Sequence, residues 1–255
     1  MAAYADKIGT IVTGTVSKIL PKLVLIDLGR TIAVMPKSEQ IEGEFYTVGS
    51  RIKVLVKNID NNSEKGPQLV VSRGSASFIE QLFRQEVPEL ETGAVEIMGI
   101  AREAGRRTTI AVTTSTPGVD PVGTFVGGRG VRVQAVMNEI GEREKIDIIT
   151  WSDNVSEYIR EALSPAEVMK VEVEGKNAKV YVSEEQQSIA IGKQGQNVRL
   201  ASKLTGYEID IILQKAQSKK KKQNVEDSLL DAIEATEEEP EQANEASAET
   251  DQIDA

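Results

Sequence analysis

Residues 126–130 read Val-Gly-Gly-Arg-Gly and lead to Ile-Asp-Ile-Ile at 146–149, while residues 191–195 read Ile-Gly-Lys-Gln-Gly and lead to Ile-Asp-Ile-Ile at 209–212. The two glycine loops are offset by 65 residues and the two Ile-Asp-Ile-Ile segments by 63, which indicates a duplicated unit with a small change of length. A Gly-x-x-Gly loop that opens a helix leaves room for phosphates against the backbone, as RNA-clamping modules require. We therefore expect two RNA-binding units in tandem.

The apolar spacing around each loop predicts one order of elements: helix, two strands, helix, loop, helix and strand. In the first unit we expect a helix within 76–90 that Pro88 ends, strands at 94–101 and 108–113, a short helix begun by Asp120-Pro121, a helix at 131–139 and a strand at 145–151. In the second unit we expect a helix at 156–162, strands at 168–174 and 178–182, a helix begun by a Ser183–Gln186 capping box, a helix at 197–204 and a strand at 207–213. Each unit is then α+β, and the short connection between them favours one rigid platform.

Short apolar runs precede the duplicated units. Strands are expected at 10–19, 23–28, 31–35, 51–59 and 68–72, separated by glycine, proline and asparagine turns. Five short strands in about 65 residues predict a small β-barrel, for which the OB type is the commonest five-stranded form. A small sandwich or an SH3-like barrel stays open as an alternative.

Composition excludes several classes of chemistry. The chain of 255 residues has no cysteine and no histidine, which removes disulfides, His–Cys zinc sites and Ser–His or Cys–His catalysis. No cluster of carboxylates or lysines replaces them, so we predict a protein that is not an enzyme, with no cofactor and no metal. No apolar run reaches the ~18 residues of a membrane span, and no signal peptide opens the sequence. We expect a cytoplasmic protein without membrane contact.

The net charge of −10 is unevenly distributed. Residues 223–255 hold twelve acidic side chains and no basic one, which leaves residues 1–222 with a net charge of +2. The body of the chain is therefore compatible with nucleic-acid binding. Residues 216–255, with the lysine run at 219–222 and the acidic tail, are expected to be disordered.

The glycine loops supply most of the candidate RNA-binding residues. Backbone amides at the start of the following helix can face phosphates, and basic or amide side chains nearby can contact phosphate or base edges. In the first copy the candidates are Gly127, Gly128, Arg129, Gly130 and Arg132. In the second copy they are Gly192, Lys193, Gln194, Gly195, Asn197, Arg199 and Lys203.

The barrel offers weaker candidates, because it lacks the aromatic stripe on which bases usually stack. Phe45 and Tyr46 are adjacent, and either of them can equally belong to the core. The electrostatic candidates are Lys18, Lys22, Arg51 and Lys53.

Several segments resemble the NusA family of bacterial transcription factors. Residues 120–136, 144–148 and 190–201 are similar to its tandem KH domains, 9–16 and 66–73 to its preceding OB-type barrel of the ribosomal-protein-S-one family, and 86–90 and 101–105 to its linkers. The resemblance covers about residues 5–213. It implies a barrel at 1–74, two type II KH domains at 75–151 and 152–215, and a tail at 216–255.

The same resemblance implies a function. Members of the family bind nascent single-stranded RNA on the transcribing polymerase and modulate pausing, termination and antitermination. RNA is thus the expected partner, with RNA polymerase and other Nus-type antitermination factors as further ones, and we expect a monomer. The family carries a large N-terminal polymerase-docking domain; only residues 1–8 precede the barrel in this sequence, so we expect that domain to be absent here.

Other classes of protein use similar modules. An accessory subunit of an RNA-degradation complex can carry KH and barrel domains, although an exosome-type cap pairs one barrel with one KH unit. A ribosomal protein can use a KH fold structurally, although such proteins are usually far more basic than +2. Both readings stay open as alternatives at this point.

Overall fold

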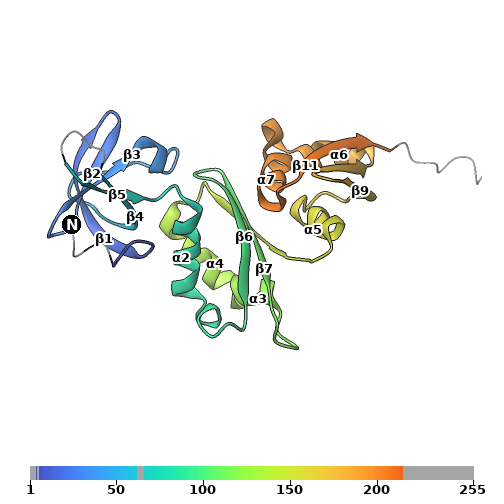
Figure 1. Cartoon of the computed structure of the whole chain (residues 1–255), viewed down its shortest axis with the longest axis horizontal. Coiled ribbons are helices and arrows are strands. Elements are labelled where there is room, and N and C mark those ends of the chain that lie inside the picture. Colours follow the sequence, from blue (N-terminus) through green and yellow to red (C-terminus); the bar gives the residue numbers. More distant parts are fainter. Residues whose placement is uncertain (1–3, 5, 62–65, 215–255) are drawn as a thin grey trace, which may run out of the picture. The chain divides into compact units, whose positions relative to one another are not determined.

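The computed structural model describes residues 4, 6–61 and 66–214. They form a β-barrel followed by two α+β units (Figure 1). The lysine run and the acidic tail expected at 216–255 lie outside the described residues. None of the described helices has both the length and the apolar character that crossing a membrane demands.

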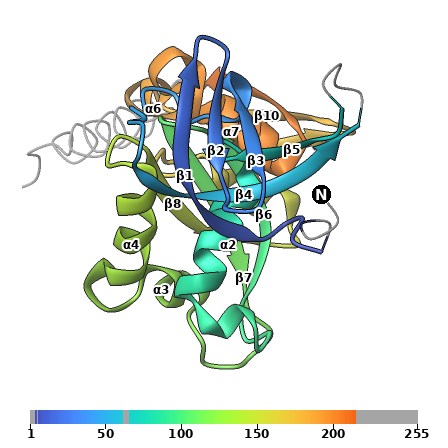
Figure 2. The ribbon, with the colours of Figure 1, turned by 90° about the vertical axis from the view of Figure 1, so that its left-hand side faces the viewer.

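The first five strands close into a barrel (Figures 1 and 2). They are β1 (Ile11–Leu20), β2 (Leu23–Asp27), β3 (Ile32–Pro36), β4 (Arg51–Asp60) and β5 (Gln68–Ser72). Their order is β1-β2-β3-β5-β4, with β1 paired to both β2 and β4 and with β3 parallel to β5. This order is that of the predicted OB-type barrel, so the sandwich alternative is wrong.

The first α+β unit follows the expected order of elements. It comprises α2 (Ala76–Glu86), β6 (Glu96–Glu103), β7 (Arg107–Thr113), α3 (Pro121–Val126), α4 (Val131–Ile140) and β8 (Lys145–Thr150). In its sheet, β7 lies between antiparallel β6 and parallel β8. Helices α2 and α4 lie on one side of β6 and β7 (Figure 1), and their apolar faces bury Phe78, Phe83 and Val136.

The second unit repeats this topology. It comprises α5 (Val155–Ala162), β9 (Lys170–Glu174), β10 (Asn177–Val182), α6 (Glu184–Ile191), α7 (Gln196–Thr205) and β11 (Glu208–Leu213). Central β10 pairs antiparallel with β9 and parallel with β11. The matched topology confirms the duplication and the type II KH arrangement predicted for both units.

One local prediction is confirmed and another is wrong. Helix α2 ends at Glu86, and Pro88, the predicted end of the helical run, begins a separate 3-10 turn. The capping box of α6 is wrong: Ser183 is the N-cap residue but makes no side-chain cap hydrogen bond. Gln186 instead accepts a hydrogen bond from the Glu167 backbone N–H at 3.0 Å, so its amide fastens the segment before β9.

A buried ion pair holds the segment that connects the barrel to the first α+β unit. The side chains of Arg102 and Glu144 are 2% and 0% exposed, and Arg102 donates to both carboxylate oxygens at 2.7 and 2.9 Å. The remaining arm of Arg102 donates to the backbone carbonyls of Arg73 and Ser75, both at 2.7 Å. Arg102, which lies in β6, therefore holds the segment between the barrel and α2 in place.

Candidate nucleic-acid interface

The two glycine loops have the same backbone conformation. Gly127 has φ 75° and ψ 168°, and its equivalent Gly192 has φ 74° and ψ 173°. Arg129 and its equivalent Gln194 have φ values of 56° and 54°, and they are the non-glycine residues with positive φ in the described chain. The loops therefore agree in conformation although half of their side chains differ.

Close packing explains the first glycine of each loop. A Cβ atom on Gly127 would lie 2.8 Å from Cγ of Arg132, and one on Gly192 would lie 2.8 Å from the backbone N of Asn197. By contrast, a Cβ on Gly128 would meet nothing within 4 Å. The first position thus requires glycine for both space and φ, whereas the second position accepts a side chain, as Lys193 shows.

We expect Gly127→Ala to destabilise the first KH unit by about 1–3 kcal/mol, because the new methyl group meets Arg132 at a left-handed backbone position. Gly128→Ala is the matched control in the same loop, and it should change stability by less than about 0.5 kcal/mol. Urea unfolding followed by the fluorescence of the single tryptophan, Trp151, measures both. Equal stabilities of the two variants would contradict the packing argument.

Each loop opens a helix that has no side-chain cap at its N-terminus. The N-cap residues of α4 and α7 are Gly130 and Gly195, both left-handed, and neither has a side chain with which to accept a hydrogen bond. The first backbone N–H groups of a helix lack intrahelical partners, and the helix dipole favours an anion there. The N–H groups of Val131 and Gln196, the first residues of α4 and α7, already donate to the carbonyls of Gly128 and Lys193. Binding of a phosphate by further backbone donors at these loops stays a prediction.

The second loop adds side-chain charge. Lys193 stands at its tip, and Arg199, on the following helix, donates to the backbone carbonyl of Gln194 at 3.2 Å. The other edge of Arg199 is bidentate with Glu103, a residue of β6 in the first unit. Arg199 lowers the pKa of the Glu103 carboxyl by this hydrogen bond, and Gln196 and Lys203 assist. Arg199 is therefore partly neutralised, while the Lys193 charge remains available to a ligand.

Asn197 is a correction to the predicted site. Asn197 is 3% exposed, and its side-chain amide donates to the carbonyls of Leu163 at 2.9 Å and Ala190 at 3.3 Å. A buried amide whose donors are taken holds the loop and does not touch RNA. We reassign Asn197 as a positioning residue.

Arg132 has the same structural task in the first unit. Its guanidinium donates to the Thr124 carbonyl at 2.7 Å, eight residues back, and to Glu89 at 3.0 Å. Asn197 likewise reaches the Ile189 carbonyl, eight residues back, at 3.4 Å. The two equivalent positions tie each loop to the helix before it. Arg129, at the tip, is left as the candidate cation of the first loop.

Phe45 and Tyr46 differ sharply in the barrel. The residue Phe45 is 89% exposed, whereas the Tyr46 hydroxyl donates to Glu44 at 2.6 Å and accepts from the Ile41 backbone N–H at 3.4 Å. Burial, followed by the neighbouring Glu44 charge, raises the pKa of Tyr46 above its ordinary value. Tyr46 is thus part of the barrel structure, and Phe45 is the aromatic ring free to stack on a base.

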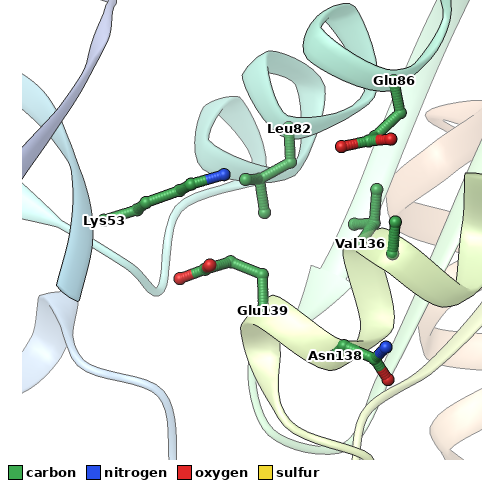
Figure 3. A pocket seen from close by; sticks show the side chains of 7 residues that line it. Lys53, Leu82, Glu86, Val136, Asn138 and Glu139 are labelled. Atoms are coloured by element: carbon green, nitrogen blue, oxygen red, sulfur yellow. The ribbon is translucent and has the colours of Figure 1, made fainter.

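The barrel cations also separate into two groups. Lys18, Lys22 and Arg51 are exposed. Lys53 instead points from β4 toward α2 and α4, into a cleft that Glu86 and Glu139 also line (Figure 3). Its ammonium donates to Gln85 at 3.3 Å. The two carboxylates make this cleft unsuitable for a phosphate, so the prediction of an RNA contact by Lys53 is not supported by its position.

The structure adds residues that the site prediction did not contain. Arg106, in the turn between β6 and β7, lines a second cleft together with Lys193, Gln194, Gln196 and Arg199. The backbone of Glu42 leaves no room for a Cβ on neighbouring Gly105, which fixes the turn. The basic sequence Arg106-Arg107 was the available signal, but it gives no hint of a contact with a loop almost 90 residues away.

Known domain families match the three parts of the chain in order. Residues 5–69 match the S1 RNA binding domain, residues 73–151 the NusA-like first KH domain and residues 155–220 the NusA-like second KH domain. Similar proteins include the transcription termination/antitermination protein NusA of Thermus thermophilus, 53% identical over 209 residues, and that of Bacillus subtilis, 46% identical over 210 residues.

These alignments cover 81% and 82% of this chain and 54% and 56% of the two relatives. The chain thus spans about half the length of the curated relatives it matches. On this evidence the chain belongs to the NusA family.

Proposed function

We propose that the chain is an RNA-binding transcription factor that contacts nascent single-stranded RNA and modulates pausing, termination and antitermination by RNA polymerase. The supporting observation is the pair of matched glycine loops, each of which opens an uncapped helix. The names of the relatives, which are transcription termination/antitermination proteins, point the same way. The chain would act by binding, without catalysis, in the cytoplasm.

Three modules would contribute to the RNA interface: the barrel at 1–74 and the KH units at 75–151 and 152–215. The RNA backbone would be clamped first at the loops and then by nearby cations. The proposed contacts are Gly127, Gly128, Arg129, Gly130, Gly192, Lys193, Gln194, Gly195, Arg199 and Lys203, with Phe45, Lys18, Lys22 and Arg51 on the barrel. RNA polymerase and other Nus-type factors are the proposed protein partners.

Transcription in vitro tests this function directly. Added to a bacterial polymerase transcribing a template with an intrinsic terminator, the chain should change the fraction of terminated transcripts. Nascent RNA carrying a photoreactive nucleotide should cross-link to it. A pull-down with core RNA polymerase reports separately whether the chain binds the enzyme or acts through the RNA. An unchanged termination fraction together with no cross-link would contradict the proposal.

A further inference from the structure

A cleft of about 340 Å³ lies beside the second glycine loop. Residues of both KH units line it: Arg106 from the β6–β7 turn of the first unit, and Lys193, Gln194, Gln196 and Arg199 from the second. The lining thus contains cationic and amide groups, and two of them, Gln196 and Arg199, donate hydrogen bonds to the carboxylate of Glu103. Guanidinium and ammonium groups that converge with amides provide the donors that a phosphate accepts.

Comparison with the cleft of Figure 3 shows that charge distinguishes the two. That cleft, of about 200 Å³, places Lys53 among the carboxylates of Glu86 and Glu139. Two carboxylates line it against one cation, and Glu139 is in addition paired with Arg73 at 2.8 Å, so Lys53 lies beside acceptors and not beside further donors. Only the cleft at the second loop, of these two, has a lining suited to a phosphodiester.

Both arginines of the cationic cleft are held by carboxylates in the free chain. Arg106 donates to the two oxygens of Glu42, in the barrel, at 2.9 and 3.1 Å, while Arg199 is bidentate with Glu103. Glu42 raises the pKa of Arg106 by this hydrogen bond and by its charge, and the Glu103 charge raises it further, whereas the positive charge of Arg199 opposes these effects. Glu103 thus acts on both guanidiniums, so a phosphate in the cleft would compete with Glu103 at Arg199 and with Glu42 at Arg106.

The Arg106–Glu42 pair is suited to exchange its partner. Its side chains are 47% and 66% exposed, and exposed pairs contribute little free energy because water screens them. A phosphate offers Arg106 the same bidentate geometry as the carboxylate does. Releasing Arg106 from Glu42 costs little, so a phosphate can replace the carboxylate.

We propose that this cleft binds a backbone phosphate of the single-stranded RNA held by the second loop, with Arg106 of the first KH unit as a direct contact and Glu42 as its internal competitor. The inference rests on the proposed RNA-binding function. It adds a contact that lies outside both Gly-x-x-Gly loops. One phosphate would thereby be bound by groups from two domains.

Two substitutions with opposite expected effects on RNA affinity distinguish RNA contact by Arg106 from a purely structural role of the Arg106–Glu42 pair. Arg106→Gln should weaken binding of a 12-nucleotide single-stranded RNA by about 3- to 10-fold and reduce the salt slope by about 0.7, the value for one lost phosphate contact. Glu42→Gln should strengthen binding by about 2- to 3-fold, because it frees Arg106. Fluorescence anisotropy of a labelled RNA with the full chain measures both. If the pair served only to join barrel and KH unit, both substitutions would weaken binding, which would overturn the proposal.

Arg84→Gln is the matched control, because it removes the same charge from a partly exposed Arg–Glu pair, that of Arg84 with Glu80 on α2. Its affinity should stay within about 2-fold of the parent chain. Equal losses for Arg84→Gln and Arg106→Gln would also overturn the proposal. If the parent chain itself fails to bind the RNA, the proposed function fails with it. If the parent binds and only Arg106→Gln is silent, the cleft assignment alone is wrong.

Discussion

Single-stranded RNA affinity is expected to fall by roughly 100-fold when Lys193 and Gln194 are both replaced by aspartate. Two charge-assisted contacts of about 1.5 kcal/mol each account for that factor, and the new carboxylates also repel phosphates. Aspartate tolerates the left-handed conformation that Gln194 has, at φ 54°, so the loop keeps its shape. The salt slope should decrease by about 0.7 for each phosphate contact that is lost.

The matched control places the same pair of substitutions on the other turn of the same KH unit. Lys176, in the turn after β9, and Asn177, the first residue of β10, are also a lysine followed by an amide. Replacing them by aspartates makes the same change of net charge. If the loop variant keeps its RNA affinity and salt slope, the loop does not clamp RNA. The same conclusion follows if the control loses as much affinity as the loop variant.

Glu144→Ala is expected to lower the free energy of unfolding by about 3–5 kcal/mol. The substitution leaves the Arg102 guanidinium buried without its counter-charge, which is much costlier than losing an exposed pair. It also removes the acceptor of hydrogen bonds from Gly105 N–H at 2.8 Å and from the Thr108 hydroxyl at 2.6 Å. Urea unfolding followed by Trp151 fluorescence reports the loss, because β8 runs from Lys145 toward that residue.

Glu80→Ala provides the comparison for this experiment. It breaks the exposed i,i+4 pair with Arg84 on α2, which contributes about 0.3–0.5 kcal/mol. A Glu144→Ala variant as stable as Glu80→Ala would show that the buried pair contributes little.

Much of the fold is predictable from the sequence, for identifiable reasons. Glycine and proline turns separate short runs such as those ending at Leu20 and Ser72, so the limits of the barrel strands follow within about one residue. The repeated Ile-Asp-Ile-Ile segments make one unit a check on the other. The capping box failed because Gln186 found a partner, Glu167, across a loop that no local rule describes.

The candidate site is only partly predictable. Backbone conformation at the glycine loops follows from the glycines themselves, whereas the orientation of Asn197 and Arg132 depends on carbonyls of the preceding helices. Phe45 and Tyr46 are neighbours in an irregular segment, where no period tells which ring faces the core. The contact between Glu103 and Arg199 joins residues 96 positions apart, and one sequence contains no signal for it.

The connections between the domains are short, and hydrogen bonds fix the first of them. Arg102 donates hydrogen bonds to the carbonyls of Arg73 and Ser75 where the barrel meets the first KH unit, and four residues, 151–154, separate β8 from α5. When domains are linked in this way, a single-stranded RNA bound at one glycine loop presents its next nucleotides to the other glycine loop at a high effective concentration. The second binding step then bears little of the entropy cost of the first. RNA affinity should therefore rise steeply with oligonucleotide length until the RNA reaches both glycine loops. The chain would in this way select RNA by the length of its unpaired segment.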